Sequence, residues 1–264
     1  MRAVILGVLA AGSFLAGGCV GQTGGQTVVF SVAAAGPTDA SAGQPLAFTS
    51  GGFDVVLTQA MLHIGAVYLD QAAPVSGAQA TDCYLTGTYV GEETSPLDVD
   101  LLNPSPQPFP AMALGITEPP ALVEQLWLTG GDINTPVDTT PILVIQGMAT
   151  QGAAAFPFTG TITIGANHAS TGGTGGGDSI CNQRIVSPIQ DPLTMEMTGG
   201  LLLRVDPRPL FVDVDFSRLP PDAGTGGYAF SDDPSVPVYA PTGQNLYSNL
   251  HSTAPYSFSW TDAL

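Results

Sequence analysis

The sequence predicts an all-β protein, an antiparallel β-sandwich of the jelly-roll or immunoglobulin-like kind, and it leaves the strand order open. Apolar and polar residues alternate with a two-residue period in about ten short segments, as expected for half-buried strands. The 33 Gly and 23 Pro residues separate these segments. No amphipathic helix pattern of ordinary length interrupts the series, so we expect strands packed on strands.

The strongest strand pattern runs from Phe53 to Leu69. Its apolar positions follow a two-residue period on either side of Gln59-Ala60, where the period slips. Such a slip predicts a β-bulge or a change of face between two strand segments. The apolar positions in question are Val55, Leu57, Leu62, Ile64, Ala66 and Tyr68.

The remaining strands are expected along the rest of the chain, separated by Gly- and Pro-containing loops. In 97–102 the alternation places Asp98 and Asp100 on one strand face and the leucines and valine on the other. Four prolines between 104 and 110 then predict an extended loop. The expected strands are 27–32, 83–90, 97–102, 121–128, 142–146, 156–164, 194–198, 201–205, 210–216, 228–231 and 256–260.

The first eighteen residues have the three parts of an export signal. Met1-Arg2 gives a positive start, residues 3–15 are almost wholly apolar, and small residues follow at 16–18. The apolar stretch is shorter than the roughly 20 residues that span a bilayer as an anchor. We therefore expect export followed by cleavage.

The boundary Ala16-Gly17-Gly18-Cys19 resembles the lipobox of bacterial lipoproteins, with Ala16 where that family usually has Leu. The resemblance implies acylation of Cys19 as the first residue of the mature chain; the alternative is an ordinary secretory signal beside an unrelated cysteine. Val20, instead of Asp, favours the outer membrane by resemblance to Gram-negative sorting. The expected organisation is a signal peptide at 1–18, a lipidated flexible tether at 19–26, and a single β-sandwich domain at 27–264. It implies a cell-envelope location, facing the periplasm or the cell surface.

The other two cysteines are expected to pair. Cys83 and Cys181 form an even set once Cys19 is acylated, and exported proteins meet an oxidising environment. We therefore predict a Cys83–Cys181 disulfide.

Four segments of the mature chain are similar to those of an uncharacterised group of exported bacterial lipoproteins. They are Phe53 to Asp70, Cys83-Tyr84, Trp127 to Asp132 and Cys181 to Arg184. This resemblance implies an exported lipoprotein domain and brings no activity with it.

The charge balance argues against nucleic acid and anionic lipid as partners. Removing 18 of the 264 residues leaves 246, and loss of Arg2 changes the net charge from −17 to −18. Such a chain repels nucleic acid and anionic lipid. We expect contact with a membrane through the lipid anchor and an unknown protein or glycan partner.

Several catalytic classes are excluded because the chain contains no lysine. A Schiff base, a Walker A loop and a Ser-x-x-Lys site each require one. There is also no Gly-x-Ser-x-Gly or His-Glu-x-x-His motif, and the carboxylates single out no glycosidase pair. We expect no enzymatic activity and no cofactor. A carbohydrate-binding module or hydrolase is one alternative, because two tryptophans and seven tyrosines could stack on sugar rings. Trp127 lies between two leucines and Trp260 alternates with Phe258, so we expect at least one tryptophan, Trp127 or Trp260, in the core.

Metal binding is the main alternative to a plain binding or structural role. Met61 and His63 are two residues apart, as are Met195 and Met197, so each pair shares one face of a strand. Thioether and imidazole ligands suit Cu(I). The competing interpretation, which we favour, makes the methionines core residues. Calcium binding by Asp98 with Asp100, or by Asp213 with Asp215, is disfavoured because no Asp-x-Asp-x-Asp-Gly loop is present.

Overall fold

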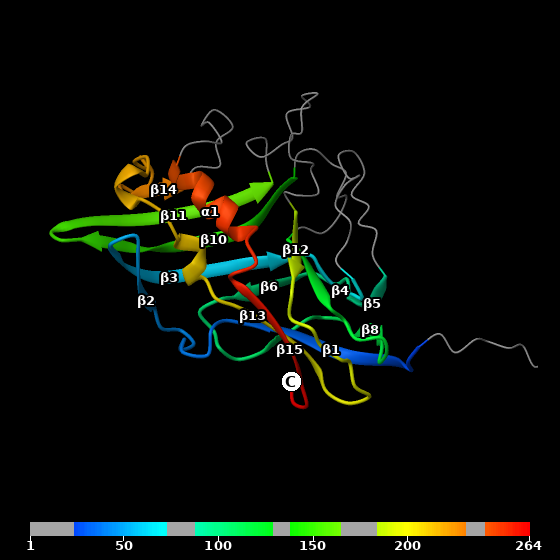
Figure 1. Ribbon diagram of the computed structural model, residues 1–264. Helices are drawn as coiled ribbons and strands as arrows, with labels where there is room; N and C mark the ends of the chain where they lie inside the picture. Colours follow the sequence, from blue (N-terminus) through cyan, green and yellow to red (C-terminus); the bar gives the residue numbers. More distant parts are fainter. Residues whose placement is uncertain (1–23, 73–87, 129–137, 165–183, 231–240) are drawn as a thin grey trace, which may run out of the picture.

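Two β-sheets packed together form the protein in the computed structural model, which describes residues 24–72, 88–128, 138–164, 184–230 and 241–264 (Figure 1). Neighbouring strands of the first sheet are, in order, β12 (Ile185–Ile189), β9 (Val123–Trp127), β4 (Ala66–Asp70), β5 (Tyr89–Glu93), β8 (Ala113–Ile116), β1 (Thr27–Ala35), β13 (Gly200–Val205) and β15 (Tyr256–Thr261), with β7 (Gln107–Pro108) beside β1. The second sheet has the order β14 (Tyr228–Phe230), β11 (Ala154–Ile164), β10 (Asp138–Gln151), β3 (Phe53–Ile64) and β2 (Leu46–Ser50), with β6 (Leu97–Asp100) beside β3.

The predicted all-β sandwich is confirmed, and the sheets are mixed instead of fully antiparallel. Two pairs run parallel, β1 with β13 and β11 with β14. The other pairs of named strands are antiparallel. The core lies between the sheets, where Leu57 and Leu62 of β3 and Leu126 and Leu203 of the first sheet are all fully buried.

A β-bulge divides β3 close to the predicted slip. Gln146 pairs with Gln59 and the next residue, Gly147, pairs with Leu57, so Thr58 is the extra residue. Before the bulge the buried residues are 53, 55 and 57, and after it they are 60, 62 and 64. The bulge therefore turns Gln59, Met61 and His63 toward the outer face of the second sheet.

The chain changes sheets at Gly65. β3 ends at Ile64 in the second sheet and β4 begins at Ala66 in the first, and the Gly65 amide donates a hydrogen bond to the Trp127 carbonyl at 2.7 Å. The long apolar pattern from Phe53 thus supplies one strand to each sheet. Sequence periodicity does not show this, because both strands have the same two-residue repeat.

The strand expected over 210–216 is wrong. Two 3₁₀ helices occupy this region, η3 (Arg208–Phe211) and η4 (Phe216–Arg218). Pro207 and Pro209 fix the backbone at the start of η3, and Asp215 caps η4 by accepting the Ser217 amide. Apolar side chains are buried here as they would be in a strand, which explains the misassignment: Leu210, Phe211, Val214 and Phe216.

A helix was not expected, yet α1 (Pro241–Leu250) is present among the described residues. Its first residue is a proline, which is favoured at the first helical position. Leu246 and Leu250, four apart, are fully buried. Within the described ranges no helix is long and apolar enough to cross a membrane.

The strand expected over 194–198 is also absent. Leu193 makes only an isolated bridge to Ala121, and regular pairing resumes at Gly200. Met195 and Met197 therefore do not share a strand face: Met195 is fully buried and Met197 is 59% exposed. The other expected strands match at least part of a described strand, except that 83–87 lies outside the described residues, as do Cys19, Cys83 and Cys181.

Candidate binding site on the outer face of β3

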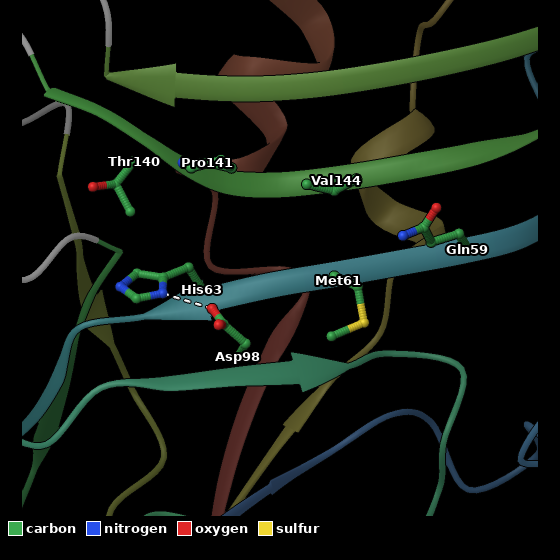
Figure 2. A pocket seen from close by; sticks show the side chains of 7 residues that line it. All are labelled: Gln59, Met61, His63, Asp98, Thr140, Pro141 and Val144. Carbon is green, nitrogen blue, oxygen red and sulfur yellow. Dashed lines mark hydrogen bonds and ion pairs between the residues drawn. The ribbon is translucent and has the colours of Figure 1, made fainter.

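Residues turned outward by the Thr58 bulge line a hollow of about 390 Å³. Volumes of about 300–1,000 Å³ are usual for sites that hold small ligands. Three neighbouring strands supply the lining: Gln59, Met61 and His63 from β3, Asp98 from β6, and Thr140, Pro141 and Val144 from β10 (Figure 2). Met61 pairs directly with Val144, and His63 with Asp98.

His63 and Asp98 form an ion pair at one side of the hollow. The His63 Nδ1 lies 2.7 Å from the Asp98 Oδ1 (Figure 2). The His63 side chain is 16% exposed, whereas the Asp98 side chain is 73% exposed. Water therefore reaches the carboxylate freely and weakens the ion pair, so the contact mainly orients the imidazole.

The contact also fixes which histidine nitrogen can accept. An ionised carboxylate has no proton to donate, so the His63 Nδ1 must carry the proton of this hydrogen bond. In the neutral ring the lone pair is then on Nε2. A carboxylate on one ring nitrogen, with the other nitrogen able to bind a metal, is the usual arrangement around a metal-binding histidine.

Proline 141 shapes the β10 side of the hollow. It has no amide hydrogen and therefore cannot donate to the β-ladder. The register of β10 against β11 shifts between Asp138 and Leu143, on either side of this proline. The irregular backbone places Thr140, Pro141 and Val144 along one wall of the hollow (Figure 2).

The four residues proposed from sequence as a copper site are not brought together. Met61 and His63 share the hollow, whereas neither Met195 nor Met197 lines it. Among the described residues, no three His, Cys, Asp or Glu side chains are placed to hold a metal ion.

Met195 has a packing role in the first sheet. Its Sδ lies 3.0 Å from the position that a Cβ on Gly91 would occupy and 2.6 Å from the corresponding position on Gly115. Gly91 of β5 and Gly115 of β8 are directly paired. The glycines therefore leave the space that the buried Met195 side chain fills. The prediction that the methionines are core residues is confirmed for Met195. It is wrong for Met197, which is exposed, and for Met61, which is half-buried on the outer face of β3.

Buried acidic groups occur on the first sheet, away from the hollow. Burial raises the pKa of Asp70 to about 6, although a hydrogen bond from Gln125 acts in the opposite direction. Burial also raises the pKa of Glu124 to about 7, and the nearby charges of Asp191 and Asp70 add to the effect. Both side chains are fully buried.

Aspartates of both pairs considered for calcium binding make contacts with protein groups. Asp100 Oδ1 accepts the Leu102 amide at 2.9 Å, while Asp98 contacts His63. Asp215 Oδ1 accepts the amide and hydroxyl of Ser217. Asp100 and Asp215 are therefore local turn and cap groups, whereas Asp98 orients His63.

Both tryptophans are half-buried and already in ring contact. The Trp127 ring centroid lies 5.0 Å from that of Tyr68, and the Trp260 centroid lies 5.0 Å from that of Phe30. The Trp260 indole also donates to the Thr198 carbonyl at 3.0 Å. Trp260 packs against the main core, as the sequence pattern had suggested for at least one tryptophan.

No protein-family model matches the chain, and neither does any curated protein. One solved structure that it resembles is MbnP from Methylosinus trichosporium, at 14% sequence identity and a TM-score of 0.37. The match covers 89% of this chain and 99% of that one. A likeness of this degree carries no argument about function.

Sequence reasoning found Met61 and His63 but missed the rest of the lining. Asp98 was assigned to a possible calcium pair, and nothing pointed to Gln59 or Thr140. The alternation in 97–102 did place Asp98 on an outward strand face. Its contact with His63 depends on the pairing of β6 with β3, which a single sequence does not reveal.

Proposed function

We propose that this protein is a non-enzymatic, lipid-anchored binding protein of the cell envelope and that the hollow beside His63 is its ligand site. The observation that carries the proposal is the hollow itself. It joins an oriented imidazole, a thioether and an amide in one concave surface. Acylated Cys19 anchors the protein in the outer membrane. The partner is a protein, a glycan or a small ligand.

The lining combines apolar and polar groups in the way that ligand sites usually do. Val144, Pro141 and the Met61 side chain offer apolar contact, whereas Gln59, Thr140 and His63 offer groups that form hydrogen bonds. Asp98 keeps the imidazole in one orientation, which lowers the entropy lost when a ligand binds.

Photo-crosslinking in the native host tests the proposal directly. A photoreactive amino acid at Thr140 should give an adduct, whereas the same residue at Gln151, at the far end of β10 and outside the lining, should not. The His63→Leu change should reduce the Thr140 adduct, because it removes both the polar ring nitrogen and the contact with Asp98. Equal adducts at both positions, or none at Thr140 together with no bound metal, would contradict the proposal.

Copper binding is the second candidate, favoured by the geometry of His63. Its Nδ1 is held by a carboxylate, which leaves Nε2 to bind a metal, and Met61 faces the same hollow. Imidazole and thioether together suit Cu(I). Among the described lining residues, only Met61 and His63 offer soft ligands, so the site differs from the four-ligand site considered from sequence.

Elemental analysis of protein purified from its native host, followed by Cu(I) titration, tests the copper candidate. A stoichiometric site that is lost in both Met61→Ala and His63→Ala would support it. Cu(I) should also raise the thermal stability of the wild-type protein, because a metal that binds only the folded state stabilises that state. Met148→Ala is the matched control, since Met148 lies on β10 outside the hollow. Copper retained in either of the two hollow variants would exclude this site.

A further inference from the structure

Half of the large hydrophobic side chains that are exposed gather around the beginning of β1. Ten such residues occur among those the structure describes, and five of them lie here. We call them the β1 patch: Val29, Met112, Leu114, Met197 and Leu264. Monomeric proteins rarely leave a contiguous apolar surface without a function.

The β1 patch is built on directly paired strands. Val29, 61% exposed, is the Cα partner of Leu114 on β8, which is 51% exposed. Met112 is two residues before Leu114, so its side chain lies on the same side of the chain. The Phe30 side chain between these positions points inward, where it contacts Trp260.

The other two members lie on the neighbouring edge of β1. β13 runs parallel to β1 with Gly200 opposite Ser31. Thr198, next to Met197, accepts a hydrogen bond from the Trp260 indole, whose ring contacts Phe30 of β1. The Leu264 Cδ1 atom lies 2.5 Å from the position that a Cβ on Gly200 would occupy. The Leu264 side chain therefore extends the apolar surface onto β13, and the exposed Met197 lies in the segment that leads into this strand.

The N-terminal segment enters the fold beside this patch. The Gln26 amide donates to the Thr117 hydroxyl at 2.9 Å, and the Thr117 amide donates to the Gln26 carbonyl at 3.0 Å. Gly24 and Gly25 lie against the backbone of Glu118, where any side chain on either glycine would clash. The described part of the chain thus begins at Gly24, next to the end of β8 (Figure 1).

The lipid at Cys19 would hold this end of the domain against the bilayer. Five residue steps separate Cys19 from Gly24, and at about 3.6 Å each they reach no more than about 18 Å. A tether this short makes contact between the patch and the membrane an intramolecular event, so that even a weak apolar contact is populated.

The surrounding charges select the kind of lipid. Glu92, exposed on β5, pairs with Leu114, and Glu196 is adjacent to Met197. The chain has no lysine that could attract an anionic headgroup. An apolar surface with an acidic border suits zwitterionic headgroups and is repelled by anionic ones.

We propose that the β1 patch is a membrane-docking surface that rests on zwitterionic lipid and turns the opposite sheet, with its hollow, away from the bilayer. The inference rests on the lipid anchor of the proposed function. It adds an orientation to that function, because the ligand site lies on the second sheet and the patch on the first.

Photoreactive lipids test the orientation. The mature protein, with whatever modification its host adds, is reconstituted into phosphatidylcholine and phosphatidylethanolamine vesicles that contain a diazirine lipid. After irradiation it is digested with pepsin, because the chain has no lysine and no arginine between Arg2 and Arg184, so trypsin would leave β1 and β8 in one long peptide. We expect lipid adducts on peptides containing Val29, Met112 and Leu114, and fewer adducts when phosphatidylglycerol replaces part of the lipid.

Two double variants give a matched comparison. Val29→Ser with Leu114→Ser should lose the adducts on β1 and β8. Val56→Ser with Met148→Ser should keep them, because Val56 and Met148 are also an exposed, directly paired apolar set but lie on the other sheet. Far-UV circular dichroism confirms that both variants fold.

Four outcomes would overturn the inference. Adducts on Val56 and Met148 peptides, or none outside the N-terminal peptide, would remove the docking surface while the anchor stands. Adducts absent from the patch in a protein that forms dimers would assign the patch to a second copy. An unmodified Cys19 with no flotation of the protein on vesicles would contradict both the anchor and the docking surface.

Discussion

Glu124 should make the protein less stable as the pH rises from about 4 to 7. The Glu124 side chain lies on β9 with no exposed surface. One carboxyl oxygen, Oε2, accepts the Asp191 amide at 3.0 Å, whereas Oε1 is buried and has no hydrogen-bond partner within the described part of the chain. Burial is the main reason that the Glu124 pKa rises to about 7 from its ordinary 4.5.

The sign follows from the two protonation states. Below about pH 4 the carboxyl group is protonated in both the folded and the unfolded chain, so it contributes no penalty. Above about pH 7 it is charged in both, and the folded state carries the cost of a buried charge. A pKa of about 7 against 4.5, at about 1.36 kcal/mol per pH unit, corresponds to a loss of about 3 kcal/mol in the free energy of unfolding.

Replacing Glu124 with Gln tests this reasoning. The amide oxygen can still accept the Asp191 hydrogen bond, but the side chain has no charge at any pH. Urea unfolding followed by tryptophan fluorescence at several pH values between 4 and 8 should show Glu124→Gln more stable than wild type at pH 8 by up to about 3 kcal/mol, with the difference vanishing near pH 4. Glu92→Gln, at an exposed position on β5, is the control and should remain close to wild type across the range. A Glu124→Gln protein that is equally destabilised at pH 4 and pH 8 would refute the buried-charge explanation.

Three further predictions concern packing and the cysteines. Met195→Ala should lower the free energy of unfolding by about 2–5 kcal/mol in urea titrations, because Met195 is fully buried, while Met148→Ala, partly exposed, should cost much less. Gly115→Ala should lower the free energy of unfolding by about 1–3 kcal/mol, since the new Cβ would lie 2.6 Å from the Met195 Sδ and 3.0 Å from the Val90 carbonyl oxygen. Gly224→Ala is the control, because the nearest atom to its new Cβ is 3.3 Å away. Equal stabilities of the two variants would be evidence against tight packing around Gly115. Cys83 and Cys181 should resist alkylation in the denatured, unreduced protein and react after reduction, and the bridge should stabilise by up to about 4–5 kcal/mol; reaction of both thiols without reductant would show that no bridge exists.

The sequence predicted those features that depend on local alternation. A two-residue period, and the points where it slips, predict the all-β fold class, the bulge near Gln59 and the outward face of Asp98. The pairing of β6 with β3 and the passage between sheets at Gly65 depend on contacts distant in sequence, so the hollow was only half predicted.

The errors have local physical causes. In 210–216 the prolines and the Asp215 cap override an apolar pattern that would also suit a strand. In 194–198 the two methionines have the spacing of a strand face, but Met195 is drawn into the space left by Gly91 and Gly115. Glycines distant in sequence thus decided the position of a side chain that the local pattern had assigned to a possible metal site.

The intact mass of the mature N-terminus tests most directly the claim that this is an envelope-anchored protein. Mass spectrometry of protein isolated from its native membranes should show a chain that begins at Cys19 and carries three acyl groups. Each buried methylene contributes about 0.8 kcal/mol to membrane affinity, so several chains hold the protein far more firmly than one. A mature chain with a free, unmodified Cys19 would contradict the account.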